Sequence, residues 1–466
     1  MHWIPQLRGL ALLLSALAIL ALGRGLPLWT GHAQTATVRL TLVISPTSPN
    51  PFGVALAEGA LNDRAQSASI PGRWEAFTVA WQGEAHAVWV YRPAGYPAHA
   101  PYPVVYLLPG WAMGPGMWQR PEVEQVAEAQ RLLLVAVEGE GSVPSYYAIY
   151  ARLPWPDGPE WRVSFYDWFI NGVVPWVERR YAVRREAGGR ALLGFSMGGK
   201  GAFSLAAHRP DLFAAAVSFG GVMDLQAHGS QAVRMVYGPP EEAIRYAADN
   251  PLDLAPNLMG VRLFLFHGAA DPEVSPEQGR RMHETLSALG YPHHWEEIPG
   301  VGHEIPPAAL ARAFAMLGKA LREPRPPPPA WRYRFAMALR RTIYGWTLVK
   351  TRPEVWSEIL QASPEGFMVR THDALTVITP SLYPRRARVR VQILDAERGS
   401  EYAAFVRISL NGRLRLTLPP GSWWVILTPL TPQPTSALSA AGPPGAFLRR
   451  PGCPEEDVPC YRIGPP

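Results

Sequence analysis

Residues 190–208 read RALLGFSMGGKGAFSLAAH, and this stretch decides the fold. It sets the pattern Gly-x-Ser-x-Gly around Ser196, between a short apolar run at 191–193 and an alanine-rich run at 200–208. The first run predicts a buried strand and the second predicts a helix. A serine on such a strand-to-helix turn is held in a strained conformation that exposes its hydroxyl group. The stretch therefore predicts a catalytic nucleophile at Ser196 rather than an ordinary glycine-rich turn.

A nucleophilic serine needs a histidine as its base and a carboxylate that orients the histidine. In α/β hydrolases the three follow one another in the order serine, acid, histidine. Asp271 lies just past the predicted strand 261–266, and His303 lies past the predicted strand 294–298. Both follow the carboxyl ends of strands, where open α/β sheets place their sites. We therefore expect Ser196, Asp271 and His303 to form a catalytic triad.

Other residues compete for these roles. Asp224 follows the predicted strand 214–219 and is an alternative to Asp271 as the acid. His267 precedes a glycine and is expected to pack its loop, while His208 is expected to end the helix that follows the serine. The sequence favours Asp271, because Asp224 would have to reach back across the sheet.

Two backbone N–H groups are expected to hold the oxyanion of the reaction. One is the N–H of Met197, directly after the nucleophile. The other is the N–H of Trp111, in the glycine-rich segment 109–116 that follows the predicted strand 104–108. Glycine allows the backbone of such a loop to approach a substrate closely. An ordinary glycine-rich turn is the alternative interpretation of this segment.

The segment 138–166 is long and aromatic, and it follows the end of the predicted strand 132–137. Aromatic rings there would line a substrate cleft or would only pack the loop, and the sequence leaves both interpretations open. The candidate substrate-binding residues are Tyr146, Tyr147, Trp155 and Trp161.

Strand-like and helical runs alternate across residues 74–321. The strand-like runs lie at 74–80, 87–92, 104–108, 132–137, 191–193, 214–219, 261–266 and 294–298. The helical runs lie at 167–180, 200–208 and 276–289. Such alternation predicts an α/β-hydrolase domain with a mainly parallel sheet that is covered by helices on both faces.

The composition and the hydrophobic pattern of the sequence change after residue 321. Residues 322–330 (REPRPPPPA) form a proline-rich linker. Beyond it, a two-residue hydrophobic period predicts a small antiparallel β-sandwich over 331–430. Alternate residues of the run 331–339 are expected to face one way, and Asn411-Gly412 is expected to close a hairpin. Residues 431–466 are rich in proline and glycine and are expected to be irregular.

The N-terminus predicts export. Residues 10–22 are apolar but shorter than the ~20 residues that span a bilayer, so residues 1–33 predict a signal peptide, with an uncleaved anchor as the alternative. Residues 34–73 form an N-terminal extension. The two cysteines, Cys453 and Cys460, favour a small disulfide loop over free thiols in an exported protein. We expect the protein to be secreted, or extracytoplasmic and tethered to a membrane through its N-terminal segment.

The charge balance gives no sign of a nucleic-acid partner. The chain has 44 lysines and arginines against 38 acidic residues, a net charge of +6. The arginines are dispersed and form no basic run or known nucleic-acid motif. The expected partner is a small-molecule or polymer-linked ester, and triad chemistry needs neither a metal nor an organic cofactor.

Several motifs, in order, resemble the putative-esterase family of α/β hydrolases, which includes S-formylglutathione hydrolases, feruloyl esterases and mycolyltransferases. They are RPAGY at 92–96, YPVVYLLPG at 102–110, GFSMGG at 194–199 and HRPDLF at 208–213. The resemblance covers residues 74–320. It implies the same fold and the same triad roles that the residues themselves predict.

The chain departs from the family's pattern at two places. Pro109 stands where the family usually has histidine or aspartate before the glycine, and Glu-Ile-Pro-Pro follows His303. Both departures reshape the pocket, so the resemblance does not identify the substrate. We expect hydrolysis of carboxylic esters through an acyl-serine intermediate. Acyl transfer to a sugar or lipid hydroxyl stays open, as does a non-catalytic surface-binding role on a hydrolase scaffold.

Overall fold

The computed structural model describes residues 72–139, 145–149, 164–430 and 461–462. Within these ranges no helix combines the length and the apolar character needed to cross a membrane. The expected signal peptide at 1–33, the extension at 34–71, Trp155, Trp161, Cys453 and Cys460 lie outside the described residues.

The first part of the described chain is built around an eight-stranded sheet in the order β1-β2-β4-β3-β5-β6-β7-β8. The first two strands pair antiparallel, and every pairing from β4 to β8 is parallel. The strands are β1 Arg73–Trp81, β2 Glu84–Arg92, β3 Val104–Leu108, β4 Leu133–Val137, β5 Arg190–Phe195, β6 Ala215–Phe219, β7 Arg262–Gly268 and β8 His293–Ile298. The predicted α/β-hydrolase sheet is confirmed.

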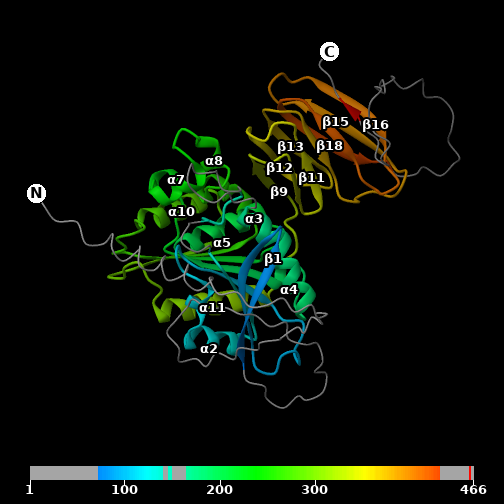
Figure 1. Cartoon of the computed structure of the whole chain (residues 1–466). Coiled ribbons are helices and arrows are strands. Elements are labelled where there is room, and N and C mark those ends of the chain that lie inside the picture. The colour runs from blue at the N-terminus through cyan, green and yellow to red at the C-terminus, as the bar shows by residue number, and fades with distance from the viewer. Residues whose placement is uncertain (1–71, 140–144, 150–163, 431–460, 463–466) are drawn as a thin grey trace, which may run out of the picture. The chain divides into compact units, whose positions relative to one another are not determined.

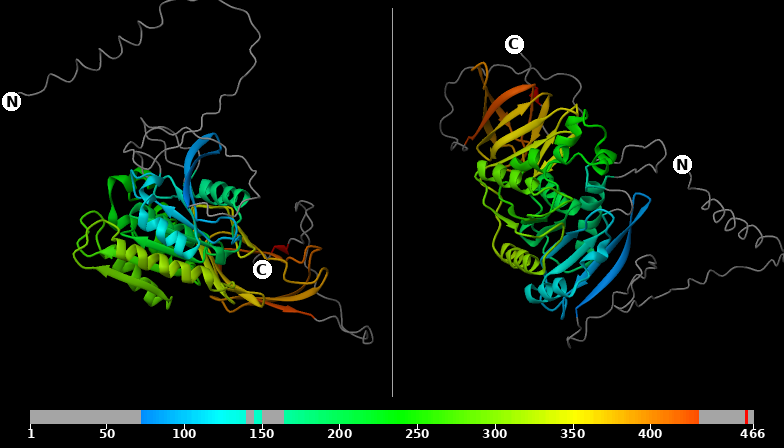
Figure 2. Two further views of the ribbon diagram at one scale, coloured as in Figure 1. Left: turned by 90° about the horizontal axis from the view of Figure 1, so that it is seen from below. Right: turned by 90° about the vertical axis from the view of Figure 1, so that its left-hand side faces the viewer.

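Helices cover both faces of this sheet (Figure 1). The helices are α2 Pro121–Gln130, α3 Phe165–Asp167, α4 Val174–Arg180, α5 Met197–His208, α6 Leu225–His228, α7 Gln231–Tyr237, α8 Ala243–Ala247, α9 Pro251–Leu254, α10 Glu277–Ala288 and α11 Pro307–Arg322. A wide helical turn at Trp168–Val173 joins α3 to α4, so the helix expected at 167–180 is present but irregular. Helices α2 and α11 cover one face and α5 and α10 the other; seen from below, α2 and α11 lie in front of the sheet (Figure 2).

Strands β3 and β4 are continuously apolar because both of their faces are covered. In β3, Tyr106 and Leu108 join the core under α5, whereas Val105 and Leu107 join the core under α2 and α11. All five residues of β3 are buried. Two apolar layers therefore hold the strand ends rigidly, and those ends carry the candidate site.

The described residues after 330 form an all-β domain of two sheets. One has the order β10-β11-β14-β17-β19 and the other the order β16-β15-β18-β13-β12-β9. The strands are β9 Trp331–Phe335, β10 Arg340–Ile343, β11 Trp346–Val349, β12 Ser357–Ser363, β13 Gly366–Thr371, β14 Leu375–Ile378, β15 Arg388–Asp395, β16 Glu401–Arg407, β17 Arg415–Leu418, β18 Gly421–Pro429 and β19 Tyr461–Arg462. Side chains from both sheets share one core, among them Leu348, Val377, Ile359 and Val391. All pairings are antiparallel except that of β17 with β19.

The alternation expected along 331–339 holds only for its first half. Trp331, Tyr333 and Phe335 are buried in β9. The strand ends there, because Met337 has a left-handed backbone (φ 54°) that breaks the two-residue period. Leu339 is consequently 51% exposed, so its expected inward orientation is wrong.

The hairpin expected at Asn411-Gly412 is also wrong. The preceding strand β16 pairs with β15 in the six-stranded sheet, whereas the following strand β17 pairs with β14 in the other sheet. Gly412 does adopt a left-handed conformation (φ 75°), and its N–H donates to the carbonyl of Ser409. Asn411-Gly412 does form a turn, but this turn leads the chain from one sheet to the other instead of joining two paired strands.

Candidate active site

Ser196 lies on a sharp turn between β5 and α5. Its backbone has φ 55° and ψ −120°, a conformation that a residue with a side chain rarely adopts. The flanking glycines make the turn possible: a methyl group on Gly194 would lie 1.9 Å from the carbonyl oxygen of Gly198, and one on Gly198 would lie 2.0 Å from that of Leu108. The strand, turn and helix predicted around Ser196 are confirmed.

His303 and Asp271 form a close pair. Nδ1 of His303 lies 2.7 Å from Oδ2 of Asp271. The other carboxylate oxygen, Oδ1, accepts hydrogen bonds from the backbone N–H groups of Glu273 and Val274, each at 2.9 Å. The loop thus holds the carboxylate of Asp271 in place, and Oδ2 can accept a hydrogen bond from a protonated Nδ1 of His303. In the neutral imidazole, that arrangement leaves Nε2 of His303 as the nitrogen that can act as a base.

The ends of β5, β6 and β7 bring this pair next to the serine. The N–H of Ser196 donates to the carbonyl of Phe219 at 2.8 Å, and the N–H of Gly220 donates to that of Phe266 at 2.9 Å. A methyl group on Gly220 would lie 3.3 Å from Oδ2 of Asp271. The ring of Phe195, directly before the serine, lies 4.7 Å from the His303 ring. The structure therefore gathers the three predicted residues at one edge of the sheet.

The competing residues make other contacts, although Nε2 of His267 also lies 3.4 Å from Oδ2 of Asp271. The carboxylate of Asp224 pairs with Arg281 and accepts a hydrogen bond from the N–H of Ala227 at the start of α6. Nε2 of His267 lies 2.8 Å from the carbonyl oxygen of Val274, and burial lowers the pKa of this histidine, so it packs the loop as a neutral side chain. Of the two candidate acids, Asp271 is the one that contacts His303.

The two expected oxyanion donors flank the serine. Met197 is the first residue of α5, and a methyl group on Gly110 would lie 3.4 Å from Cβ of Ser196. Trp111 follows Gly110, and its side chain is 47% exposed. Within the described part of the chain, neither the N–H of Met197 nor that of Trp111 donates to a protein acceptor. Both groups are therefore free to bind a negatively charged oxygen.

Tyr146 and Tyr147 link the two segments that carry these donors. The hydroxyl of Tyr147 donates to the carbonyl of Pro109 at 2.7 Å, and the N–H of Tyr146 contacts Sδ of Met197 at 3.3 Å. Both tyrosines have left-handed backbones, with φ of 47° and 53°. Tyr147 is completely buried, which supports the packing interpretation of its ring. Trp155 and Trp161, the other candidates of this group, lie outside the described residues.

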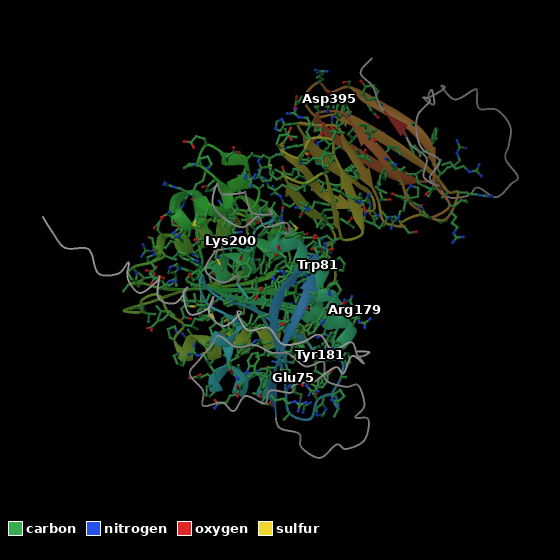
Figure 3. All side chains as sticks on the ribbon, viewed as in Figure 1. Glu75, Trp81, Arg179, Tyr181, Lys200 and Asp395 are labelled. Atoms are coloured by element: carbon green, nitrogen blue, oxygen red, sulfur yellow. The ribbon has the colours of Figure 1, made fainter. Side chains whose placement is uncertain are left out.

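Sequence reasoning missed a buried polar cluster beneath the serine. Nζ of Lys200, on the first turn of α5, donates to the carbonyl of Tyr146 at 2.9 Å and to Asp249 at 2.6 Å. Asp249 also lies 2.9 Å from Nε2 of His208. All three side chains are buried, and burial lowers the pKa of His208. Figure 3 labels Lys200 within the α/β domain.

A signal for this cluster was present in the sequence. Lys200 is the sole lysine or arginine between residues 191 and 208, in a helix that is otherwise small and apolar. A charged side chain on such a helix is buried only when a partner compensates it. The sequence does not show that the partner is Asp249. For metals, the described residues contain no group of three or more histidine, cysteine or acidic side chains placed to hold an ion.

The mostly parallel sheet and the serine turn beside a histidine–carboxylate pair define an α/β hydrolase. Residues 82–303 match the family model described as "Putative esterase". Over this stretch the chain is similar to the putative-esterase family, and the resemblance inferred from its motifs is confirmed.

Curated relatives match over a limited length. "Esterase Rv1288" of Mycobacterium tuberculosis strain H37Rv is 36% identical over 163 residues, which cover 30% of this chain and 36% of that protein. "Acyl-protein thioesterase 1" of Gibberella zeae is 41% identical over 59 residues, covering 13% of this chain and 25% of that protein. The chain thus spans about a third or less of the length of these relatives.

Among solved structures, an S-formylglutathione hydrolase from Agrobacterium tumefaciens is 16% identical and covers 56% of this chain and all of its own, with a TM-score of 0.45. A CE1 ferulic acid esterase from Anaeromyces mucronatus, in complex with ferulic acid, is 18% identical and covers 55% of this chain and 95% of its own, with a TM-score of 0.41.

Proposed function

We propose that this protein hydrolyses carboxylic esters through an acyl-serine intermediate. The observation that carries the proposal is the 2.7 Å contact between Nδ1 of His303 and Asp271, made beside the strained turn of Ser196. A serine on such a turn next to an oriented imidazole has what nucleophilic attack on a carbonyl requires. The match of residues 82–303 to the family model described as "Putative esterase" supports an ester as the substrate.

In the first half of the reaction, Nε2 of His303 takes the hydroxyl proton of Ser196 while the serine oxygen bonds to the carbonyl carbon of the ester. The oxyanion of the tetrahedral intermediate accepts hydrogen bonds from the N–H groups of Met197 and Trp111. His303 then gives its proton to the alcohol oxygen as the carbon–oxygen bond breaks, which releases the alcohol and leaves the acyl-serine.

In the second half, water takes the place of the alcohol. His303 accepts a proton from this water, whose oxygen attacks the acyl carbon. Collapse of the second intermediate returns the proton to Ser196 and releases the carboxylic acid. Asp271 keeps Nδ1 of the imidazole protonated throughout and stabilises the imidazolium. The positive end of α5 lies behind Ser196 and adds to the stabilisation of the oxyanion.

The test replaces the proposed nucleophile and a matched serine. Ser196→Ala should lower kcat on p-nitrophenyl acetate by at least about 10³-fold, because only binding and the oxyanion donors remain. It should also abolish labelling by a fluorophosphonate. Ser204→Ala is the control: Ser204 lies on α5, the helix that follows Ser196, and its one hydrogen bond among the described residues donates to the carbonyl of Gly201. If Ser196→Ala keeps the wild-type rate, the proposal is wrong.

A further inference from the structure

An open cleft of about 450 Å³ adjoins the triad on the side of Asp271. One wall comes from the end of α6 and the turn before α7, with His228 and Ser230. The other comes from the loop between β7 and α10, with Glu273 and Ser275. The cleft is thus formed by two segments that each follow a strand end next to the proposed nucleophile.

Three side chains of the cleft can form further hydrogen bonds: those of His228, Glu273 and Ser275. The hydroxyl oxygen of Ser275 accepts from a backbone N–H group, which leaves its proton to donate, whereas the hydroxyl of Ser230 already bonds to Tyr146. Among the described residues no group hydrogen-bonds to the side chain of Glu273 or to the imidazole of His228. Burial lowers the pKa of His228, and nearby His303 lowers it further, so at neutral pH this imidazole both donates and accepts.

The charge and polarity of the lining restrict what fits. No lysine or arginine occurs among the described residues that line the cleft, and its carbon surface comes from alanine and proline. Glu273 is 72% exposed and keeps its charge free to act on a ligand. An anionic group would meet this carboxylate without compensation, and an alkyl chain would cover polar groups without replacing their hydrogen bonds to water.

The position of Glu273 indicates which part of the ester faces this cleft. Its Oε2 lies 4.0 Å from Nε2 of His303. In the triad mechanism Nε2 is the atom that protonates the leaving alcohol. The alcohol oxygen must therefore lie against Nε2, and the rest of the alcohol extends past Glu273 toward His228.

We infer that this cleft binds the alcohol part of the ester and selects neutral, hydroxyl-bearing alcohols over anionic and alkyl ones. His228 and Ser275 exchange hydrogen bonds with the hydroxyl groups, and Glu273 accepts one while repelling carboxylates and phosphates. This inference rests on the proposed function, because it takes the role of His303 from that mechanism. It makes His228 and Glu273 the residues that determine specificity for the leaving group.

Three acetate esters test the selection: glyceryl monoacetate, O-acetylglycerate and butyl acetate. The first two differ by a CH₂OH in place of a carboxylate, and the third lacks further polar groups. For the wild-type protein, kcat/KM for glyceryl monoacetate should exceed that for each of the others by about tenfold, the effect of one or two charge-assisted or buried hydrogen bonds.

Variants then assign the selection to residues. Glu273→Gln should raise kcat/KM for O-acetylglycerate relative to glyceryl monoacetate by about fivefold, the effect of removing one like charge near 4 Å in water. His228→Leu should lower the ratio of glyceryl monoacetate to butyl acetate by about tenfold, and His228→Gln should restore most of it. Glu277→Gln is the control, since Glu277 lies on α10 beside Arg280 and outside the cleft.

The outcomes separate the two proposals. If the wild type hydrolyses all three esters at similar kcat/KM, or if the Glu273 and His228 variants shift the ratios no more than Glu277→Gln does, the cleft does not select the alcohol. If Ser196→Ala then no longer hydrolyses butyl acetate, the proposed function is still supported. If no ester is hydrolysed and no fluorophosphonate label is taken up, both proposals are overturned.

Discussion

Replacing Tyr147 by phenylalanine removes one hydroxyl group and leaves the buried ring in place. That hydroxyl is the group that donates to the carbonyl of Pro109 at 2.7 Å. Pro109 precedes Gly110 and Trp111, so the bond holds the loop that carries one of the two proposed oxyanion donors. We therefore expect Tyr147→Phe to affect both stability and catalysis.

The size of each effect follows from the burial of the bond. Tyr147 is completely buried, and Tyr147→Phe leaves the carbonyl of Pro109 without this donor, which costs about 1–3 kcal/mol in the free energy of unfolding. Complete loss of one oxyanion donor costs about 10²–10³ in kcat. The loop is loosened rather than removed, so we expect kcat to fall by about tenfold, or ~1.4 kcal/mol, with KM nearly unchanged.

The assay compares Tyr147→Phe with Tyr246→Phe. The hydroxyl of Tyr246 also donates to a backbone carbonyl, that of Gly238, at 2.7 Å, and its ring is also buried. Urea unfolding should show similar losses of stability in the two variants. Steady-state kinetics on p-nitrophenyl acetate should show a lower kcat in Tyr147→Phe alone. Equal kcat values in the two variants would refute the reasoning, because the bond would then support only the core.

Two further predictions concern charged groups. Lys200→Met should lower the free energy of unfolding by about 3–5 kcal/mol, because it leaves Asp249 charged and buried. Adding Asp249→Asn should recover part of this loss. If urea unfolding shows that the effects of the two substitutions simply add, the two residues are not paired. Asp271→Asn should lower kcat by about 10⁴-fold, because the imidazole of His303 loses the partner that fixes its tautomer. Asp224→Asn should keep kcat within about tenfold of the wild-type value. The reverse order in steady-state kinetics would identify Asp224 as the acid.

The sheet and the three proposed triad residues could be predicted because local patterns determine them. A strand buried on both faces is expected to be continuously apolar, and β3 and β4 are. Parallel strands present all their carboxyl ends at one edge, so residues that directly follow such strands meet there. Ser196, Asp271 and His303 each follow a strand, and the structure gathers them.

Strand pairings that depend on a segment far away in the sequence were predicted less well. Asn411-Gly412 has the chemistry of a tight turn, but the turn residues do not determine which sheet the next strand joins. Here the partner of β17 is β14, about 40 residues earlier in the chain. The prediction for Leu339 fails for a different, local reason: β9 ends at Phe335, and the left-handed backbone of Met337 breaks the alternation before Leu339.

The proposed oxyanion site shows why this limit matters for function. Its two donors, Met197 and Trp111, come from segments that touch only in the folded chain, and stabilising an oxyanion requires both at once in a fixed geometry. The turn at Tyr146 and Tyr147 connects these segments, and the buried ammonium group of Lys200 holds that turn against α5. A buried charge needs its own partner, which Asp249 provides. The residues proposed to react can therefore be predicted from strand ends, whereas those that hold the proposed reacting groups in place are identified only from contacts between distant segments.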